Sequence, residues 1–201
     1  MNYLAHCFLA QKDGESLMGN LLGDFIKGAD LKSQSQRVML GLENHQAVDR
    51  FTDQHQSLRP LKKNLSKARR RFSGIISDVV FDHFLVKHWE QFSDQGLDDF
   101  IEHSYREILS VQHFMHEPMR RAMIFMVEDD GLRINQEISG VSQTLDRLSH
   151  RIRFKNQLRG AIDEVEENYV GYENGFLSIF PDLKDHIEQL AIETPLILEK
   201  K

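Results

Sequence analysis

Apolar residues recur along most of the chain at spacings of three and four positions, which is the period of an α-helix. The pattern predicts helices near residues 3–11, 16–27, 34–54, 60–71, 74–92, 97–115, 118–129, 138–151, 157–177 and 180–193. Pro118 stands in the first turn of one predicted helix, and Pro181 opens the last one. No stretch alternates apolar and polar residues over more than a few positions. We therefore expect an all-α fold, a helical bundle of about 8–10 helices in a single domain spanning residues 1–201.

The composition narrows the classes of protein to consider. A chain of 201 residues suits one domain, and 40% hydrophobic with 28% charged residues excludes a disordered chain. No apolar run approaches the roughly 18 residues of a membrane span, so we expect no membrane partner. The opening segment, residues 1–10, contains His6 and has no basic leader, which argues against a signal peptide. The single cysteine excludes an internal disulfide and favours the cytoplasm, and the net charge of −6 argues against a nucleic-acid partner.

Two aspartates of the predicted helix 74–92 fall on its apolar side. A helix advances about 100° per residue, and this projection places Asp78 and Asp82 between Ile75, Leu85 and Trp89. Burying a bare carboxylate costs several kcal/mol, roughly, so both side chains need a proton, an ion pair or a metal ion.

The predicted helix 34–54 carries a similar column, in which His45, Asp49 and Asp53 follow one another at intervals of four and face inward. In the predicted helix 16–27, Asp24 lies at the edge of the apolar side together with Asn20. Gly19 and Gly23 leave one side of that helix bare, so that another backbone could approach closely.

A bound cation explains these inward acids better than structural ion pairs do. Three predicted helices each turn a carboxylate, or a column of histidine and carboxylate, toward the interior. Few lysines or arginines on the inner faces could neutralise these acids, although ion pairs stay the alternative. Imidazole and carboxylate are ligands for Mn, Fe or Zn in helical bundles, and Mg²⁺ suits a carboxylate-rich set. Such ions activate water and neutralise phosphoryl oxygens, so the residues predict hydrolysis of a phosphoester or phosphodiester.

A basic segment, residues 59–71, interrupts this acidic chain. It contains Arg59, Lys62, Lys63, Lys67, Arg69, Arg70 and Arg71 and no acidic residue. A solvated helix face and an anion-binding surface are both open interpretations, and the second suits a polyanionic partner or a phosphate-bearing substrate.

Several segments, in order along the chain, resemble the acyl carrier protein phosphodiesterase family. They are Met1-Asn2-Tyr3-Leu4-Ala5-His6, residues 19–25, residues 45–55 and residues 73–85. The resemblance implies an HD-like fold, distantly related to the HD phosphohydrolases, and a metal-dependent enzyme that removes 4′-phosphopantetheine from holo-acyl carrier protein. Manganese is the metal implied, with Mg²⁺ or Fe²⁺ as alternatives. HD enzymes carry an adjacent His-Asp doublet, whereas this chain has Asp82-His83.

Carried over to this sequence, the resemblance implies a site with three kinds of residue. The implied metal ligands are His6, Asp24, His45, Asp49, Asp78 and Asp82. Asp49 or Asp82 would orient or deprotonate the attacking water, and His83 would protonate the leaving serine oxygen of the carrier. We expect the acidic carrier to be held by Arg50 together with Lys62, Lys63, Lys67, Arg69, Arg70 and Arg71.

Two other functions stay open on the sequence. An HD-like phosphohydrolase could use the same site on a nucleotide or another small phosphodiester. A helical binding protein for acidic partners would instead hold its inward acids in salt bridges and bind no transition metal. Cys7 is expected to be a core residue, because neighbours such as His6 and Cys7 do not face each other on a helix.

Overall fold

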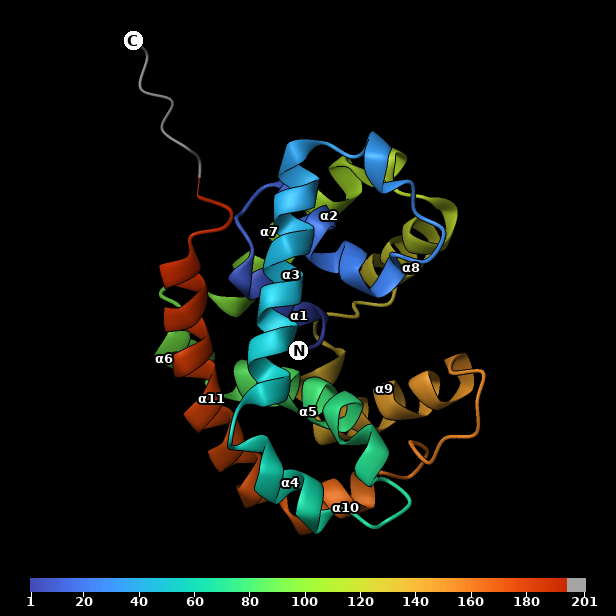
Figure 1. Ribbon diagram of the computed structural model, residues 1–201, viewed down its shortest axis with the longest axis vertical. Helices are drawn as coiled ribbons and strands as arrows, with labels where there is room; N and C mark the ends of the chain where they lie inside the picture. Colours follow the sequence, from blue (N-terminus) through green and yellow to red (C-terminus); the bar gives the residue numbers. More distant parts are fainter. Residues whose placement is uncertain (195–201) are drawn as a thin grey trace.

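The computed structural model describes residues 1–194, and within them helices are the only regular structure (Figure 1). The all-α prediction is thereby confirmed, with eleven α-helices in the described part of the chain in place of the expected 8–10. They are α1 (Tyr3–Leu9), α2 (Gly14–Leu22), α3 (Gln36–Gln54), α4 (Leu58–Asn64), α5 (Ser73–Lys87), α6 (Trp89–Phe92), α7 (Leu97–Ser110), α8 (Glu117–Glu128), α9 (Ile138–Arg151), α10 (Ile162–Glu167) and α11 (Tyr169–Leu190). Five short 3₁₀ turns join them: η1 (Gly23–Phe25), η2 (Leu31–Ser33), η3 (Arg70–Phe72), η4 (Gln112–Phe114) and η5 (Ile134–Gln136).

Several predicted helices are shorter than expected. The helix predicted over 16–27 ends at Leu22 and tightens into η1, which removes Asp24 from the column that it was expected to share with Asn20. The helix predicted over 60–71 ends at Asn64, because buried Leu65 turns to an extended conformation. The carbonyl of Leu65 is satisfied by the guanidinium of Arg70 instead of by a further helical turn.

The last helix runs straight through Pro181, so the expectation that this proline opens a helix is wrong. Proline removes one hydrogen bond from a helix interior. Burial on both sides offsets that loss, since Phe176, Phe180 and Leu183 are fully buried and the rings of Phe176 and Phe180 stack at 5.0 Å. Here the apolar face, not the proline, determines where the helix begins and ends.

One hydrophobic core joins these helices, with α5 near its centre. Phe81, Phe84 and Leu85 of α5 are fully buried, and α5 packs on α1, α9 and α11. In Figure 1, α3 and α11 run side by side on one flank, with the N-terminus in the middle of the molecule. The expected core position of Cys7 is confirmed. No helix within residues 1–194 is long and apolar enough to cross a membrane.

Helices α2 and α3 approach each other closely at Gly19. A Cβ atom on Gly19 would lie 2.2 Å from the carbonyl oxygen of Val38 and 2.8 Å from the Cα of Gly41. The bare face expected at Gly19 is therefore used for backbone contact, and this contact positions the polar residues at the end of α2 against α3.

Candidate metal centre and adjoining cavity

His6 of α1 and His45 and Asp49 of α3 meet in one group. Nε2 of His6 lies 3.3 Å from Oδ1 of Asp49, and Nε2 of His45 lies 3.1 Å from Oδ2 of the same carboxylate. One potential ligand atom from each residue lies within 4.8 Å of the others, so the group could hold a metal ion. The two imidazole rings stack with their centroids 4.0 Å apart.

Local structure directs the His45 ring toward Asp49. The four-residue spacing in α3 places both side chains on one face. Nδ1 of His45 donates to the backbone carbonyl of Asn20 at 2.7 Å, which leaves Nε2 facing the carboxylate. Gly23 makes room for the ring, because a Cβ at that position would lie 2.0 Å from Cδ2 of His45. Gly23 thus accommodates an imidazole, whereas the sequence suggested that it would accommodate a backbone.

The His6 ring is buried and short of partners. It is 1% exposed, and neither ring nitrogen has a well-formed hydrogen bond within the described part of the chain. Burial lowers the pKa of His6 to about 3, so the ring is neutral at ordinary pH. A neutral, buried imidazole with an unused nitrogen is what a metal ligand requires and is otherwise a costly arrangement.

The electrostatics of the group favour a carboxylate that stays ionised. Although partial burial opposes it, the His45 and His6 rings close to its oxygens hold the pKa of Asp49 well below its usual range. Burial also opposes protonation of His45, but the hydrogen bond to Asp49 raises its pKa above the usual value. The Asp49 side chain is 43% exposed, so the group is open to solvent on its carboxylate side.

A cationic group already lies beside this centre. The amino group of Met1 contacts Oδ1 of Asp78 at 2.8 Å and Oδ1 of Asp49 at 3.3 Å. Burial alone would lower the pKa of this amine, but the two carboxylates raise it to about 10. An ammonium between these oxygens shows that the position stabilises positive charge. Together with the unpartnered His6, it indicates that the residues fit a divalent cation.

The other predicted ligands lie around this group and not within it. Asp78 is 30% exposed at its side chain, and Asp24 projects from η1 as an exposed residue; both line a cavity beside the centre. Asp53 is exposed on α3, so the expectation that the inward column continues to this residue is wrong. The column therefore ends at Asp49, although Thr52 on another face of α3 is still buried.

Asp82 and His83 have partners of their own in the fold. The two oxygens of Asp82, which is 2% exposed, accept from the backbone N–H groups of Leu4 and Ala5 at 2.9 and 3.1 Å and so cap the start of α1. Burial raises the pKa of Asp82 to about 7. Both nitrogens of His83 are engaged, Nδ1 by the carbonyl of Asn135 at 2.9 Å and Nε2 by the hydroxyl of Tyr169 at 2.8 Å. These contacts give both side chains a structural task, and their catalytic role stays a prediction.

A second hydrogen-bond network holds Asn20, whose backbone carbonyl orients the His45 ring. Glu193, which is 4% exposed, accepts from the Asn20 amide at 2.9 Å and from the Ser16 hydroxyl. The Asn20 amide oxygen in turn accepts from Asn44 at 2.9 Å. The sequence placed Asn20 only at the edge of an apolar face, and it gave no signal for Glu193, which follows the last helix. Burial raises the pKa of the Glu193 carboxyl.

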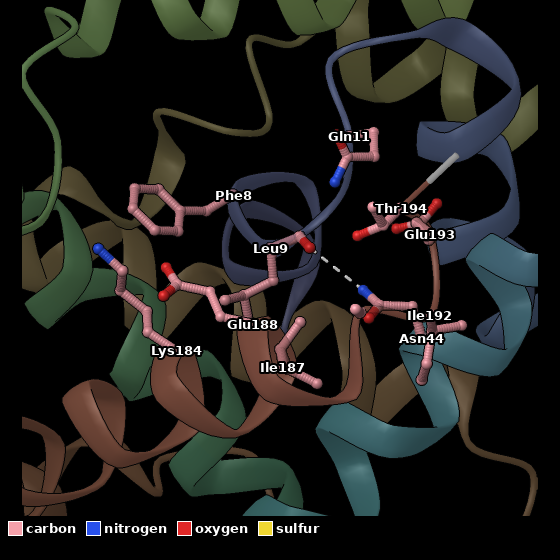
Figure 2. Close-up of a pocket in the computed structure, with 11 residues that line it drawn as sticks. Phe8, Leu9, Gln11, Asn44, Lys184, Ile187, Glu188, Ile192, Glu193 and Thr194 are labelled. Atoms are coloured by element: carbon pink, nitrogen blue, oxygen red, sulfur yellow. Dashed lines mark hydrogen bonds between the residues drawn. The ribbon is translucent and has the colours of Figure 1, made fainter. Parts of the chain in front are cut away.

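Figure 2 shows the side of this network that faces a small cavity of about 380 Å³. The Asn44 amide points at the carbonyl of Leu9, which accepts its hydrogen bond at 3.2 Å, and Glu193 lies next to it. Lys184 and Glu188 of α11 line the same cavity. Neither histidine of the candidate centre nor Asp49 contributes to this cavity, so it is separate from the candidate centre.

A larger cavity, of about 770 Å³, adjoins the candidate centre between α5, α8 and α9. Met1 and Asp78 line it next to the candidate centre, and the exposed Asp24 lines it as well. Three arginines also line it, Arg121 on α8 and Arg147 and Arg151 on α9. Sequence reasoning missed these arginines, because they are scattered over two helices and form no charge run.

Much of the basic segment is engaged in holding loops together. Arg69 pairs with Glu164 and donates to two backbone carbonyls, while Arg70 and Arg71 donate to the carbonyls of loop residues. The lysines of this segment, Lys62, Lys63 and Lys67, are exposed, as is Arg50 on α3. Contact of these residues with a partner stays a prediction.

Comparison with known sequences tests the resemblance. The family model described as "Acyl carrier protein phosphodiesterase" matches residues 1–183. This chain belongs to that family. A Yersinia pestis protein named acyl carrier protein phosphodiesterase is 31% identical over 186 residues, covering 91% of this chain and 95% of the relative. A Serratia proteamaculans (strain 568) protein of the same name is 32% identical, with the same coverage.

Family membership confirms the predicted resemblance and the prediction of an enzyme, a hydrolase of phosphodiester bonds. The matched residues include His6, His45 and Asp49, whereas Glu193 lies beyond them. No solved structure matches the chain, so the expected likeness to HD enzymes stays a prediction.

Proposed function

We propose that this chain is a metal-dependent phosphodiesterase that releases 4′-phosphopantetheine from holo-acyl carrier protein and leaves the apo-carrier. One observation carries the proposal: the neutral, buried and unpartnered His6 ring stacks on His45 and faces the ionised Asp49, in a chain of this family. The names of the relatives support the choice of the carrier as substrate.

His6, His45 and Asp49 would hold the metal ion, with Mn²⁺ as the first choice and Mg²⁺ or Fe²⁺ as alternatives. A bound divalent ion would lower the pKa of water and neutralise charge on the phosphoryl oxygens. Asp78 and Asp24 lie at the edge of the same space, where they could bind a second ion or orient the attacking water.

The chain's own residues would organise the reaction around the phosphorus atom. Water adds its oxygen to phosphorus and loses a proton, while the bond from phosphorus to the carrier's serine oxygen breaks and that oxygen gains a proton. Of the two predicted bases, Asp49 is the better placed to orient the water, since its carboxylate is partly exposed and Asp82 has both oxygens bonded to backbone N–H groups.

The test is to incubate holo-carrier with the protein and Mn²⁺ and to measure the mass of the carrier. We expect loss of the 4′-phosphopantetheine mass, and we expect Asp49→Asn to lower the rate by at least about 100-fold, as for loss of a ligand or base. Asp53→Asn, one turn further along α3 and exposed, is the matched control and should keep the rate. An unchanged carrier mass with folded, Mn²⁺-loaded protein would overturn the proposal.

A further inference from the structure

The larger cavity has the size and the position of a substrate site. Its volume of about 770 Å³ lies within the usual range for small-molecule sites, roughly 300–1,000 Å³. Its inner end is formed by Asp78 and the Met1 amino group, which contacts Asp49 at 3.3 Å. A ligand in this cavity would therefore extend directly from the candidate metal centre.

The walls suit a long, mostly apolar chain. Val79 of α5 and Met126 of α8 are buried, and Ala122 and Leu148 are partly buried across the cavity from α5. Phe125 also lines the cavity and is 55% exposed, so part of its ring is free to contact a bound chain. A chain of methylene and amide groups could bury its length here and leave its amides near the polar rim.

Three arginines, Arg121, Arg147 and Arg151, also line this cavity. Arg147 lies over the Phe125 ring at 5.7 Å and pairs with Asp129 at 2.9 Å, and the side chain of Arg121 is 74% exposed. Arg151 lies beside Asp24 and the phenol of Tyr3. Arginines on the edge of an otherwise acidic molecule complement an anionic partner.

We infer that this cavity binds the 4′-phosphopantetheine arm of the carrier, with the apolar wall of α5, α8 and α9 along the pantetheine chain. The arginine rim, Arg121, Arg147 and Arg151, then contacts the acidic carrier at the cavity mouth. The identity of the occupant rests on the proposed function. In this inference the carrier docks on the α8–α9 rim, because the rim adjoins the cavity, whereas three consecutive arginines of the basic segment hold loops together.

The direct test measures the binding of pantetheine 4′-phosphate, the free arm, by isothermal titration calorimetry, with inorganic phosphate as the reference ligand. We expect the arm to bind at least about tenfold more tightly than phosphate, since it alone buries apolar surface. Ala122→Phe fills the cavity and should bring the affinity for the arm down to that for phosphate. Phe125→Ala should weaken arm binding about tenfold, whereas Phe114→Ala, equally exposed but outside the cavity, should not change it.

The rim is tested with holo-carrier itself, whose binding is measured by surface plasmon resonance. Arg147→Glu should weaken binding by roughly 10- to 100-fold, the range for a lost hydrogen bond to a charged group. Arg120→Glu is the matched control. It makes the same change of charge at a residue of α8 that does not line the cavity. Lys63→Glu in the basic segment should also leave binding unchanged.

The outcomes separate this inference from the proposed function. Equal affinity of the wild type for arm and phosphate, or normal arm binding by a folded Phe125→Ala protein, would overturn the inference even if holo-carrier is cleaved. Tight arm binding that Phe125→Ala weakens, in a protein that does not cleave holo-carrier, would support the cavity and remove the proposed function. Phe125 is exposed, so this variant decides the matter even if Ala122→Phe does not fold.

Discussion

Replacing Gly23 by alanine should damage the candidate metal centre, although at a helical position alanine would normally stabilise the fold. Gly23 has helical angles, φ −52° and ψ −38°, so alanine adds no backbone strain and should stabilise by about 0.5–1 kcal/mol. Its Cβ, however, would lie 2.0 Å from Cδ2 and 2.1 Å from Nε2 of His45, where ordinary contacts begin at 3.4 Å. The ring must therefore move by about 1.4 Å.

A movement of that size breaks the two contacts that orient His45. These are the 2.7 Å hydrogen bond to the carbonyl of Asn20 and the 3.1 Å approach to Asp49. Each is worth about 1 kcal/mol, so the net effect on folding is a small loss. The effect on metal affinity is larger, roughly 10- to 100-fold, as for other losses of the groups that orient a ligand.

The assay is Mn²⁺ binding by electron paramagnetic resonance, with melting temperature measured on the same samples. Gly74→Ala is the matched control, because Gly74 lies in the first turn of α5 and an added Cβ would meet nothing closer than Asp53 at 3.9 Å. The control should raise the melting temperature and keep Mn²⁺ affinity. If Gly23→Ala behaves in the same way, the His45 ring does not bind Mn²⁺ from the position described above, and the reasoning is refuted.

Three further predictions concern the surroundings of the centre. Glu193→Gln should lower Mn²⁺ affinity through Asn20, by at least about threefold, whereas the same change at the exposed Glu188 of α11 should not. Equal effects of the two variants in an Mn²⁺ titration would contradict the network. Asp82→Ala leaves two N–H groups of α1 without their acceptor and should lower the free energy of unfolding by about 1–3 kcal/mol, and an unchanged urea midpoint would count against the cap. The rise in melting temperature on adding Mn²⁺ should grow between pH about 5 and about 8. At low pH protons compete with the ion for His45, whose pKa is raised, and as the pH rises through that pKa the metal-free protein loses its His45–Asp49 stabilisation. A rise in melting temperature that is the same at every pH would exclude His45 as a ligand.

The helical period of the sequence predicted most of what depends on one helix at a time. The pairing of His45 with Asp49 follows from a four-residue spacing alone, and the structure places both where that spacing requires. The helix predicted over 138–151 has the bounds that the structure shows. The prediction that Pro181 opens a helix was wrong because proline's preference for the first helical turn is weaker than the burial of the aromatic rings around it, which keeps the helix continuous.

What the pattern could not predict depends on contacts between helices. Asp82 was correctly expected to face inward, yet both its oxygens accept from N–H groups at the start of α1, and no pattern within α5 reveals the N–H groups of another helix. Arg121, Arg147 and Arg151 line one cavity although they stand on two different helices, so counting charges along the chain could not bring them together.

The brevity of α1 makes assembly of the proposed metal centre a late event in folding. Seven residues are too few to hold a helix in water, and this one gains its first turn only when Asp82 of α5 arrives. His6 thus reaches Asp49 through folding of the whole chain and not through any preformed segment. We expect a peptide of residues 36–54, which contains His45 and Asp49 but not His6, to fail to retain Mn²⁺. The time course of Mn²⁺ binding during refolding should therefore report when α1 docks against α3.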